Sequence, residues 1–530
     1  MKRNHFPFYL IFLLSVCNAF AQVQYTKNVG ADVQKYIFNL ALNDATNQIE
    51  GEAQIKVKVD KNTNSFTLDL IEKSGDYGMV VSSVLEDDKK ASYTYANNKI
   101  KIDFNAVADT TKTFTITYKG IPERGLVIDT TKYGKRSFFG DNWPTLARHW
   151  LPCVDHPYDK AAVTFAITAP DHYDVVATGK KIEESNLGNG YKLTTYEEPA
   201  PVPMKVITIG VTEFASAYLG TVNNIPISAW VYPENRLEGF NDYAVAVKVL
   251  QYFIDNVGPY SYAKLANMQA KTQWGGLENA GTIAYFEDSV TGENKVEGLI
   301  AHEIAHQWFG NSATEGSWNH VWLSEGFATY FSLLYLEHVY GNDKRKEVLK
   351  DNKKKVIAYY KRNPSPIVDM NITEAMKVLS INTYEKGGWV LNMLRHKLGD
   401  EVFWEGIRWY YNTFKDSNAM TEDFQKAMEE VSGQSLDAFF NQWIFTKGFP
   451  ELKYNYTYKK GKMVMEIAQV QDHFTFSFPL EIGIVTKNGM EIQTIDVDKK
   501  SVTVEIPVSV KPTSIVLDPE EWLLFENKNE

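Results

Sequence analysis

The hydrophobic pattern of this 530-residue chain changes its period twice. From Tyr36 to about Pro233, apolar residues alternate with polar ones or form short runs, such as YIFNLALN, EGEAQIKVKV and KTFTITY, between polar turn clusters. This pattern is typical of strands whose successive side chains point to opposite faces of a sheet. From about Glu234 to Lys447 the apolar residues recur at helical spacing. After Gly448 the alternation returns, which predicts strands again.

These changes predict a multidomain α+β protein. We expect an all-β N-terminal domain over residues 22–233, a mostly helical domain over 234–447 and a small C-terminal β-sandwich over 448–530. Within the last segment, LEIGIVTKNGMEIQTIDV predicts a hairpin with Asn488-Gly489 at its turn.

The first 21 residues have the composition of an export signal. Lys2 and Arg3 precede an apolar run from Phe8 to Val16, and Ala19-Phe20-Ala21 offers a small-residue cleavage site. The apolar run is shorter than the ~20 residues that a membrane-spanning helix needs. We therefore predict cleavage before Gln22, a mature chain without an integral membrane segment, and a periplasmic or secreted location.

Charge and cysteine content narrow the possible partners further. The formal net charge of −11 becomes −13 when the two leader cations are removed, which argues against binding to nucleic acid. Of the two cysteines, Cys17 lies in the leader and only Cys153 remains, so we expect no intrachain disulfide. Lipid attachment at Cys17 is disfavoured because Val16 is bulkier than the small residue expected before it.

The middle segment contains AHEIAHQWFGN at residues 301–311. On a helix, residues four apart lie on the same face, so His302 and His306 would point in the same direction. Two such imidazoles can bind Zn²⁺ at about 2.0–2.1 Å, and Glu303 can then act as general base toward an activated water. The alternative is a pair of surface or core histidines with this spacing. Because histidine is rare in this chain, we favour the zinc site.

A catalytic zinc needs a third protein ligand and keeps its fourth position open. Eighteen residues separate His306 from Glu325, which stands in VWLSEGFATYF at the start of an apolar helical run. A helix there could pack beside the first one and direct the carboxylate toward the ion. By composition alone, a solvated glutamate in the first turn of a helix is an equal alternative.

Together, HEIAHQWFGN and WLSEGFATYF resemble the H-E-x-x-H-x(18)-E signature of the gluzincin aminopeptidases, the family of membrane alanyl aminopeptidase and leukotriene hydrolase. The resemblance implies a thermolysin-like catalytic domain in a short three-domain form. It also implies that His302, His306 and Glu325 bind one Zn²⁺ per chain and that Glu303 is the catalytic base. The implied substrates are peptides with a free N-terminus, from which N-terminal residues are removed.

Upstream, TQWGGLENAGTIAY resembles the family's G-x-M-E-N motif, with Gly275, Gly276, Leu277, Glu278 and Asn279 in its five places. An aminopeptidase has to hold a protonated amine, and a buried carboxylate does so through a charge-assisted hydrogen bond. The resemblance assigns this role to Glu278. Outside the family context, a glutamate in a glycine-rich turn would be the simpler interpretation.

Downstream, INTYEKGGWVLNML resembles the family segment that ends in Y-E-K-G. The resemblance implies that the phenol of Tyr384 donates a hydrogen bond to the oxyanion of the transition state, a contact worth a few kcal/mol. The chain contains 30 tyrosines, so the residues alone do not distinguish this one from a core or surface tyrosine.

The chain departs from the family pattern at Leu277, which replaces the methionine of G-x-M-E-N, and in two further places. Trp143, in GDNWPTLARHW ahead of LPCVDHP, occupies the position where many members carry a glutamine or glutamate that binds the substrate amine. We therefore expect Glu278 to carry more of the amine recognition, helped by Asn142 or Asp141. In addition, Ser324 replaces the usual asparagine next to the third metal ligand.

These observations predict a zinc aminopeptidase. Two alternatives remain: hydrolysis of an epoxide, because the leukotriene hydrolase branch uses the same metal site, and a silent protein that binds peptide ends. The presence of every named chemical residue argues against the silent protein.

Overall fold

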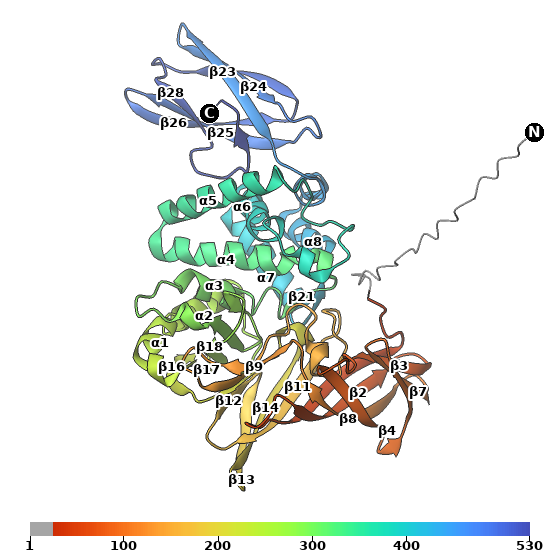
Figure 1. Ribbon diagram of the computed structural model, residues 1–530. Coiled ribbons are helices and arrows are strands. Elements are labelled where there is room, and N and C mark those ends of the chain that lie inside the picture. The colour runs from red at the N-terminus through yellow and green to blue at the C-terminus, as the bar shows by residue number, and fades with distance from the viewer. Residues whose placement is uncertain (1–24, 530) are drawn as a thin grey trace, which may run out of the picture.

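A computed structural model describes residues 25–529 of the chain. The predicted export signal, including Cys17, lies outside the described residues. In Figure 1, the N-terminal strands (red to yellow) form the lower part of the molecule, the helices its middle and the C-terminal strands (blue) its upper part. The predicted α+β fold, with a mostly helical part between two β-rich parts, is confirmed.

The N-terminal part consists of three sheets around a shared apolar core. Their strand orders are β13-β14-β11-β1-β2-β8-β4-β5, β3-β7-β6 and β12-β15-β10-β9. Every second residue of β2 is buried, as expected for a strand with one face on the core. The strands are β1 Ala31–Ala41, β2 Ile49–Val59, β3 Thr63–Asp69, β4 Gly78–Glu86, β5 Lys89–Lys90, β6 Ser92–Ala96, β7 Lys99–Ala106, β8 Thr110–Ile121, β9 Leu126–Thr130, β10 Arg136–Gly140, β11 Ala161–Pro170, β12 Asp174–Ala177, β13 Lys180–Gly188, β14 Tyr191–Val202 and β15 Ile209–Thr212.

A five-stranded sheet, of order β16-β17-β18-β20-β19, joins the N-terminal part to the helices. Its strands are β16 Ala215–Val222, β17 Ile225–Val231, β18 Leu265–Ala270, β19 Gly276–Leu277 and β20 Thr282–Phe286. Strand β17 pairs with β18 in parallel, so this sheet contains strands from both sides of residue 233. The division of the chain into domains at that residue stays a prediction.

The helical part carries the metal-ligand sequence. Its helices are α1 Arg236–Tyr243, α2 Ala246–Asn256, α3 Glu297–Ala305, α4 Trp322–Tyr340, α5 Asn342–Tyr360, α6 Gly387–Leu398, α7 Asp400–Phe414, α8 Thr421–Ser432 and α9 Asp437–Phe440, with the π-helical turns η7 Asn382–Lys386 and η8 Asn441–Phe445 and the short strands β21 Ala313–Glu315 and β22 Ser417–Ala419. Helices α3 and α4 pack against each other, and α4 also packs on α5, α6 and η7.

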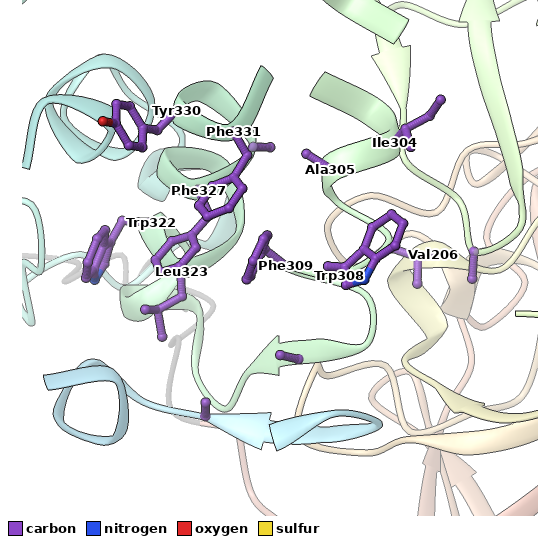
Figure 2. Close-up of a cluster of buried hydrophobic side chains, with 14 of the residues drawn as sticks. Val206, Ile304, Ala305, Trp308, Phe309, Trp322, Leu323, Phe327, Tyr330 and Phe331 are labelled. Carbon is purple, nitrogen blue, oxygen red and sulfur yellow. The ribbon is translucent and has the colours of Figure 1, made fainter. Parts of the chain in front are cut away.

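An aromatic core fixes α3 relative to α4. Figure 2 shows Phe309, which follows α3, lying between Trp308 and the side chains of α4. The ring centroid of Phe309 is 4.9 Å from that of Phe327 and 4.5 Å from that of Phe331. Burying aromatic side chains contributes much of the energy of such an interface. The relative position of the two helices is therefore set by apolar packing beneath the polar site.

Glycine permits a second close contact, between α4 and α6. A Cβ atom on Gly326 would lie 3.0 Å from the Cα of Gly387 and 3.0 Å from the carbonyl oxygen of Thr383. A side chain at either glycine would push the two helices apart. This contact holds the turn η7 against the start of α4.

The C-terminal part contains two sheets, of order β27-β24-β23-β29 and β26-β25-β28. Its strands are β23 Glu451–Lys459, β24 Lys462–Gln469, β25 Phe478–Thr486, β26 Gly489–Val497, β27 Ser501–Pro507, β28 Ser514–Leu517 and β29 Glu526–Asn527. The predicted hairpin is β25-β26, but Thr486 pairs with Gly489, so its turn residues are Lys487-Asn488 and not Asn488-Gly489. Gly489 instead opens β26 with a φ of 121°, which favours glycine. None of the helices within residues 25–529 combines the length and the apolar character that crossing a membrane requires.

Candidate active site

Three predicted metal ligands meet between α3 and the first turn of α4. The Nε2 atoms of His302 and His306 are 3.1 Å apart. The Glu325 Oε2 atom lies 3.7 Å from the first of these nitrogens and 3.2 Å from the second. In a tetrahedral zinc site with bonds of about 2.1 Å, ligand atoms are about 3.4 Å from one another. The three side chains thus fit one small cation and leave room for a fourth ligand.

The charges of these side chains also favour a cation. Burial alone would lower the pKa of His306, but the Glu325 carboxylate outweighs burial and raises it to about 9. Burial would in turn raise the pKa of Glu325, yet attraction to His306 and hydrogen bonds to both histidines hold it far below its usual range. The site is therefore more stable with positive charge between the ligands, as a divalent metal ion would supply.

Hydrogen bonds orient the second histidine. Its Nδ1 atom lies 3.2 Å from the carbonyl oxygen of Phe309 and 3.1 Å from the hydroxyl of Ser324. A carbonyl only accepts, so an N–H at Nδ1 leaves Nε2 of His306 unprotonated and free for a metal. Ser324, which replaces the family's usual asparagine, thus contacts a ligand and not the metal position.

Glu303 projects from α3 toward the edge strand β19. The side chain is 4 % exposed, and one Cβ atom added at Gly276 would lie 2.3 Å from its Oε1. Gly276 is therefore needed for the close approach of strand and carboxylate. Burial raises the pKa of Glu303 well above its usual range, and the carboxylates of Glu278 and Glu325 add to the rise against the opposing charge of His306. A raised pKa suits a group that has to take up a proton near neutral pH.

Glu278 lines the same cavity. One carboxylate oxygen of Glu278, one of Glu303 and one ring nitrogen of His306 all lie within 4.8 Å of one another. The indole N–H of Trp143 donates a hydrogen bond of 2.8 Å to Glu278 Oε1. The Lys205 ammonium lies 5.6 Å from the Trp143 ring centroid and 2.5 Å from a carboxylate oxygen of Glu315. Trp143 therefore holds the glutamate in place and is itself held by a buried ion pair.

Asn142 and Asp141 do not line the cavity that contains the metal ligands. Asn142 donates to the carbonyl oxygens of Met204 and Ile207 and accepts a hydrogen bond from Trp150, so its amide is fully used in the core. Asp141 accepts hydrogen bonds from Thr272 and Trp274 and lines a separate cavity. The structure does not support the expected help from Asn142 or Asp141 in amine recognition.

Tyr384 lies on the turn η7, opposite α3. Its ring stacks on that of His302, with centroids 6.2 Å apart and planes at 10°. Burial raises the pKa of the phenol well above its usual range, and the carboxylates of Glu325, Glu278 and Glu303 add to this effect. The phenol is therefore protonated at neutral pH and able to donate a hydrogen bond.

The remaining motif residues have different placements. Gly275 and Gly276 line the cavity, whereas Leu277 is buried in an apolar cluster with Trp143 and Trp318. Asn279 is 2 % exposed, does not line the cavity, and its side-chain nitrogen has no hydrogen-bond partner among the described residues. Direct substrate contact by Asn279 remains a prediction that this placement does not favour.

Two family models match the chain. The Peptidase M1 N-terminal domain matches residues 32–204, and the Peptidase family M1 domain matches residues 242–443. Together these segments make up more than half of the chain. The chain belongs to the M1 peptidase family. All of the metal ligands and motif residues described above except Trp143 lie in the second segment.

Known members of the M1 family match over different lengths. Glutamyl aminopeptidase from Sus scrofa is 28 % identical over 327 residues, which cover 59 % of this chain and 35 % of that protein. Probable aminopeptidase 2 from Sulfurisphaera tokodaii is 25 % identical over 464 residues, which cover 83 % of this chain and 58 % of that protein. The chain thus spans between 34 % and 39 % of the length of the pig, human and rat glutamyl aminopeptidases.

A solved structure has the same fold. The M1 zinc metallopeptidase from Deinococcus radiodurans aligns with a TM-score of 0.68 and 23 % sequence identity, covering 79 % of this chain and 95 % of that one. The similarity extends through most of both molecules.

A buried lysine of this M1 peptidase lies two residues after Tyr384. Lys386 is 1 % exposed, and its ammonium has no hydrogen-bond partner among the described residues. Burial lowers its pKa to about 7. Below that pH the folded chain carries a buried, unpaired charge, which is costly. Between pH 7 and the ~10.4 of an exposed lysine, the folded chain binds fewer protons than the unfolded chain, so stability rises with pH.

We expect Lys386→Met to be more stable than the wild type at pH 6, by a few kcal/mol, because the unpaired charge is gone. The advantage should shrink as the pH is raised toward 10. Urea unfolding at a series of pH values measures the difference. As a control, Lys397→Met, an exposed lysine on α6, should differ from the wild type by less than about 0.5 kcal/mol at every pH. A constant difference for Lys386→Met would contradict the analysis.

Proposed function

We propose that this chain is a zinc-dependent aminopeptidase that removes single residues from the free amino end of peptides, with one Zn²⁺ held by His302, His306 and Glu325. The observation that carries the proposal is the buried Glu278 carboxylate beside the metal ligands, in a cavity open to solvent. A metal site alone would suit an endopeptidase, whereas an additional buried carboxylate suits a substrate that ends in an ammonium group at this position.

Each residue has a separate task in the proposed reaction. A bound Zn²⁺ supplies a Lewis acid that polarises the scissile carbonyl and makes a water molecule more acidic. Glu303 takes the proton of the attacking water and passes it to the leaving nitrogen. The Tyr384 phenol donates a hydrogen bond to the developing oxyanion. Glu278 binds the substrate ammonium and so places the first peptide bond, and no later one, beside Glu303.

The two alternative functions have less support. The named relatives are aminopeptidases, which argues for peptide hydrolysis and not for epoxide hydrolysis. A silent binding protein has no need for a buried general base with a raised pKa, and Glu303 has this property.

The first test removes the base. Glu303→Gln should lower kcat on fluorogenic aminoacyl substrates by about 10²–10⁴-fold, because general base catalysis contributes this much. Its zinc content, measured by elemental analysis, should stay at one per chain, and a chelator should inactivate the wild type. Glu297→Gln is a matched control, because this glutamate lies on α3 outside the cavity. A zinc-loaded wild type that cleaves none of the substrates, or a fully active Glu303→Gln, would refute the proposal.

The second test removes the hydrogen bond to the amine-binding glutamate. Trp143→Phe keeps an aromatic, though smaller, ring at this position but loses the indole N–H that donates to Glu278. Hydrogen bonds to charged groups contribute about 1.5–3 kcal/mol, so kcat/KM should fall by at least about tenfold, mainly through KM. The control is Trp318→Phe. Trp318 packs edge-on against Trp143 but forms no hydrogen bond to Glu278, so this substitution should lower kcat/KM by less. If both substitutions lowered kcat/KM equally, Trp143 would contribute only through packing and not through its hydrogen bond to Glu278.

We also propose that the chain is exported and acts on peptides outside the cytoplasm. The support is the order of Lys2, Arg3, an apolar run and a small-residue cleavage site in the first 21 residues. When the full chain is expressed in a secreting host, N-terminal sequencing of the purified protein should give Gln22 as the first residue. A protein that keeps Met1 and stays in the cytoplasm would contradict export.

A further inference from the structure

The cavity with the metal ligands extends beyond them, between α3, α4 and α5. Its volume is about 440 Å³, which is in the range of pockets that bind small ligands. The walls of this extension are formed by Leu299 of α3, Thr329, Leu333 and Leu336 of α4, and Val348, Asn352 and Lys355 of α5. The reaction proposed above uses none of these side chains. The extension is therefore free to select the substrate.

The position of Glu278 decides which part of a substrate enters the extension. Glu278 contacts Trp143 of the N-terminal part, whereas Figure 1 shows α5 on the far side of α4 from the N-terminal strands. When the ammonium is bound at Glu278, the chain after the scissile bond has to lie on the other side of the metal ligands. It therefore enters the extension between α4 and α5.

One face of α5 offers two polar groups to this part of the substrate. Val348, Asn352 and Lys355 are spaced by four and three residues, which places them on one side of the helix. Asn352 is 9 % exposed and lines the cavity. Its side-chain amide is not among the buried polar groups that lack a partner, so it faces the solvent in the cavity and is available to a ligand there.

The Lys355 side chain is 56 % exposed and lines the same cavity as the predicted metal ligands. Its Nζ atom lies 3.1 Å from Oε1 of Glu385, which directly follows Tyr384. The ring of Tyr384 in turn stacks on His302. An extended peptide advances by about 3.3–3.6 Å per residue, so we expect only the first few residues after the scissile bond to lie in this cavity. The ammonium has three N–H donors, and Glu385 uses one.

The charge that α5 offers to the cavity comes from one side chain. The helix carries seven lysine and arginine side chains against three carboxylates, but six of the seven are paired with carboxylates and only Lys355 lines the cavity. An anionic group in the cavity therefore has Lys355 as its cation on this helix. The apolar walls formed by Leu299, Leu336 and Val348 do not compete for such a group but suit an apolar side chain.

We propose that Lys355 and Asn352 bind the C-terminal carboxylate of short peptides, so that the preferred substrates are di- and tripeptides with an apolar side chain after the scissile bond. This inference rests on the proposed aminopeptidase function. The carboxylate accepts hydrogen bonds from the ammonium and the amide, which neighbour each other on the helix face. Longer peptides place their carboxylate beyond this reach and gain nothing from the two side chains.

The test compares a tripeptide acid with its C-terminal amide. The tripeptide is X-Ala-Leu, where X is the residue that the zinc-loaded wild type removes fastest from aminoacyl reporters. We expect the wild type to have about tenfold higher kcat/KM for the acid than for the amide, with most of the difference in KM. In Lys355→Met this ratio should fall toward one, and Lys355→Arg should retain part of it. A hexapeptide acid and its amide should be cleaved equally by the wild type.

The control is Lys354→Met, which removes a neighbouring lysine that is also exposed and paired, with Asp351, but is absent from the cavity wall. Its acid-to-amide ratio should equal that of the wild type, whereas a general effect of α5 charge would lower it equally. An equal rate for acid and amide in an active wild type, or an unchanged ratio in Lys355→Met, would overturn the inference and leave the aminopeptidase proposal intact. A wild type that cleaves neither reporters nor peptides would overturn both.

Discussion

The packing of α3 on α4 is the contact on which the rest of the site depends. Each helix alone carries an incomplete set of ligands: two imidazoles on the first and one carboxylate on the second. The contacts among the aromatic rings of Phe309, Phe327 and Phe331 fix the position of α4 relative to α3. The two imidazole nitrogens and the carboxylate oxygen therefore surround one point, where a metal ion would bind. Apolar energy thus offsets the cost of bringing charged and polar groups together in a buried place.

Residues of the N-terminal strands complete the site from the opposite side. The indole of Trp143 contacts Glu278, and the buried pair of Lys205 and Glu315 supports the indole from behind. An indole is only a donor, so Trp143 orients the Glu278 carboxylate and offers no second acceptor. In the proposed function Glu278 binds the substrate amine, which links substrate binding to the contact between the N-terminal strands and the helical part through one side chain.

The far end of the cavity has a different physical character. There the wall is formed by α5, which also contacts the C-terminal part: the guanidinium carbon of Arg345 lies 3.9 Å from the ring centroid of Trp522, between β28 and β29. The same helix therefore joins the third part of the molecule and presents Asn352 and Lys355 to the cavity. A substrate would lie between a carboxylate at one end and an ammonium at the other, which matches the two charged ends of a short peptide.

The sequence by itself determined the order of the three parts and the common direction of two histidines, because hydrophobic period and helical spacing are local properties of the chain. Glu325 followed only from the family resemblance, because its place beside them depends on how α4 packs on α3. His302 and His306 share a helix face wherever that helix is placed. Three features depended on residues far away in the chain: the hydrogen bond from Trp143 to Glu278, the hydrogen bonds that hold the Asn142 amide in the core, and the sheet that crosses residue 233. Lys355 also gave no signal among the many lysines of its helix. Only tertiary packing decides which distant side chains share a cavity, because that depends on contacts between elements and not on their own periods.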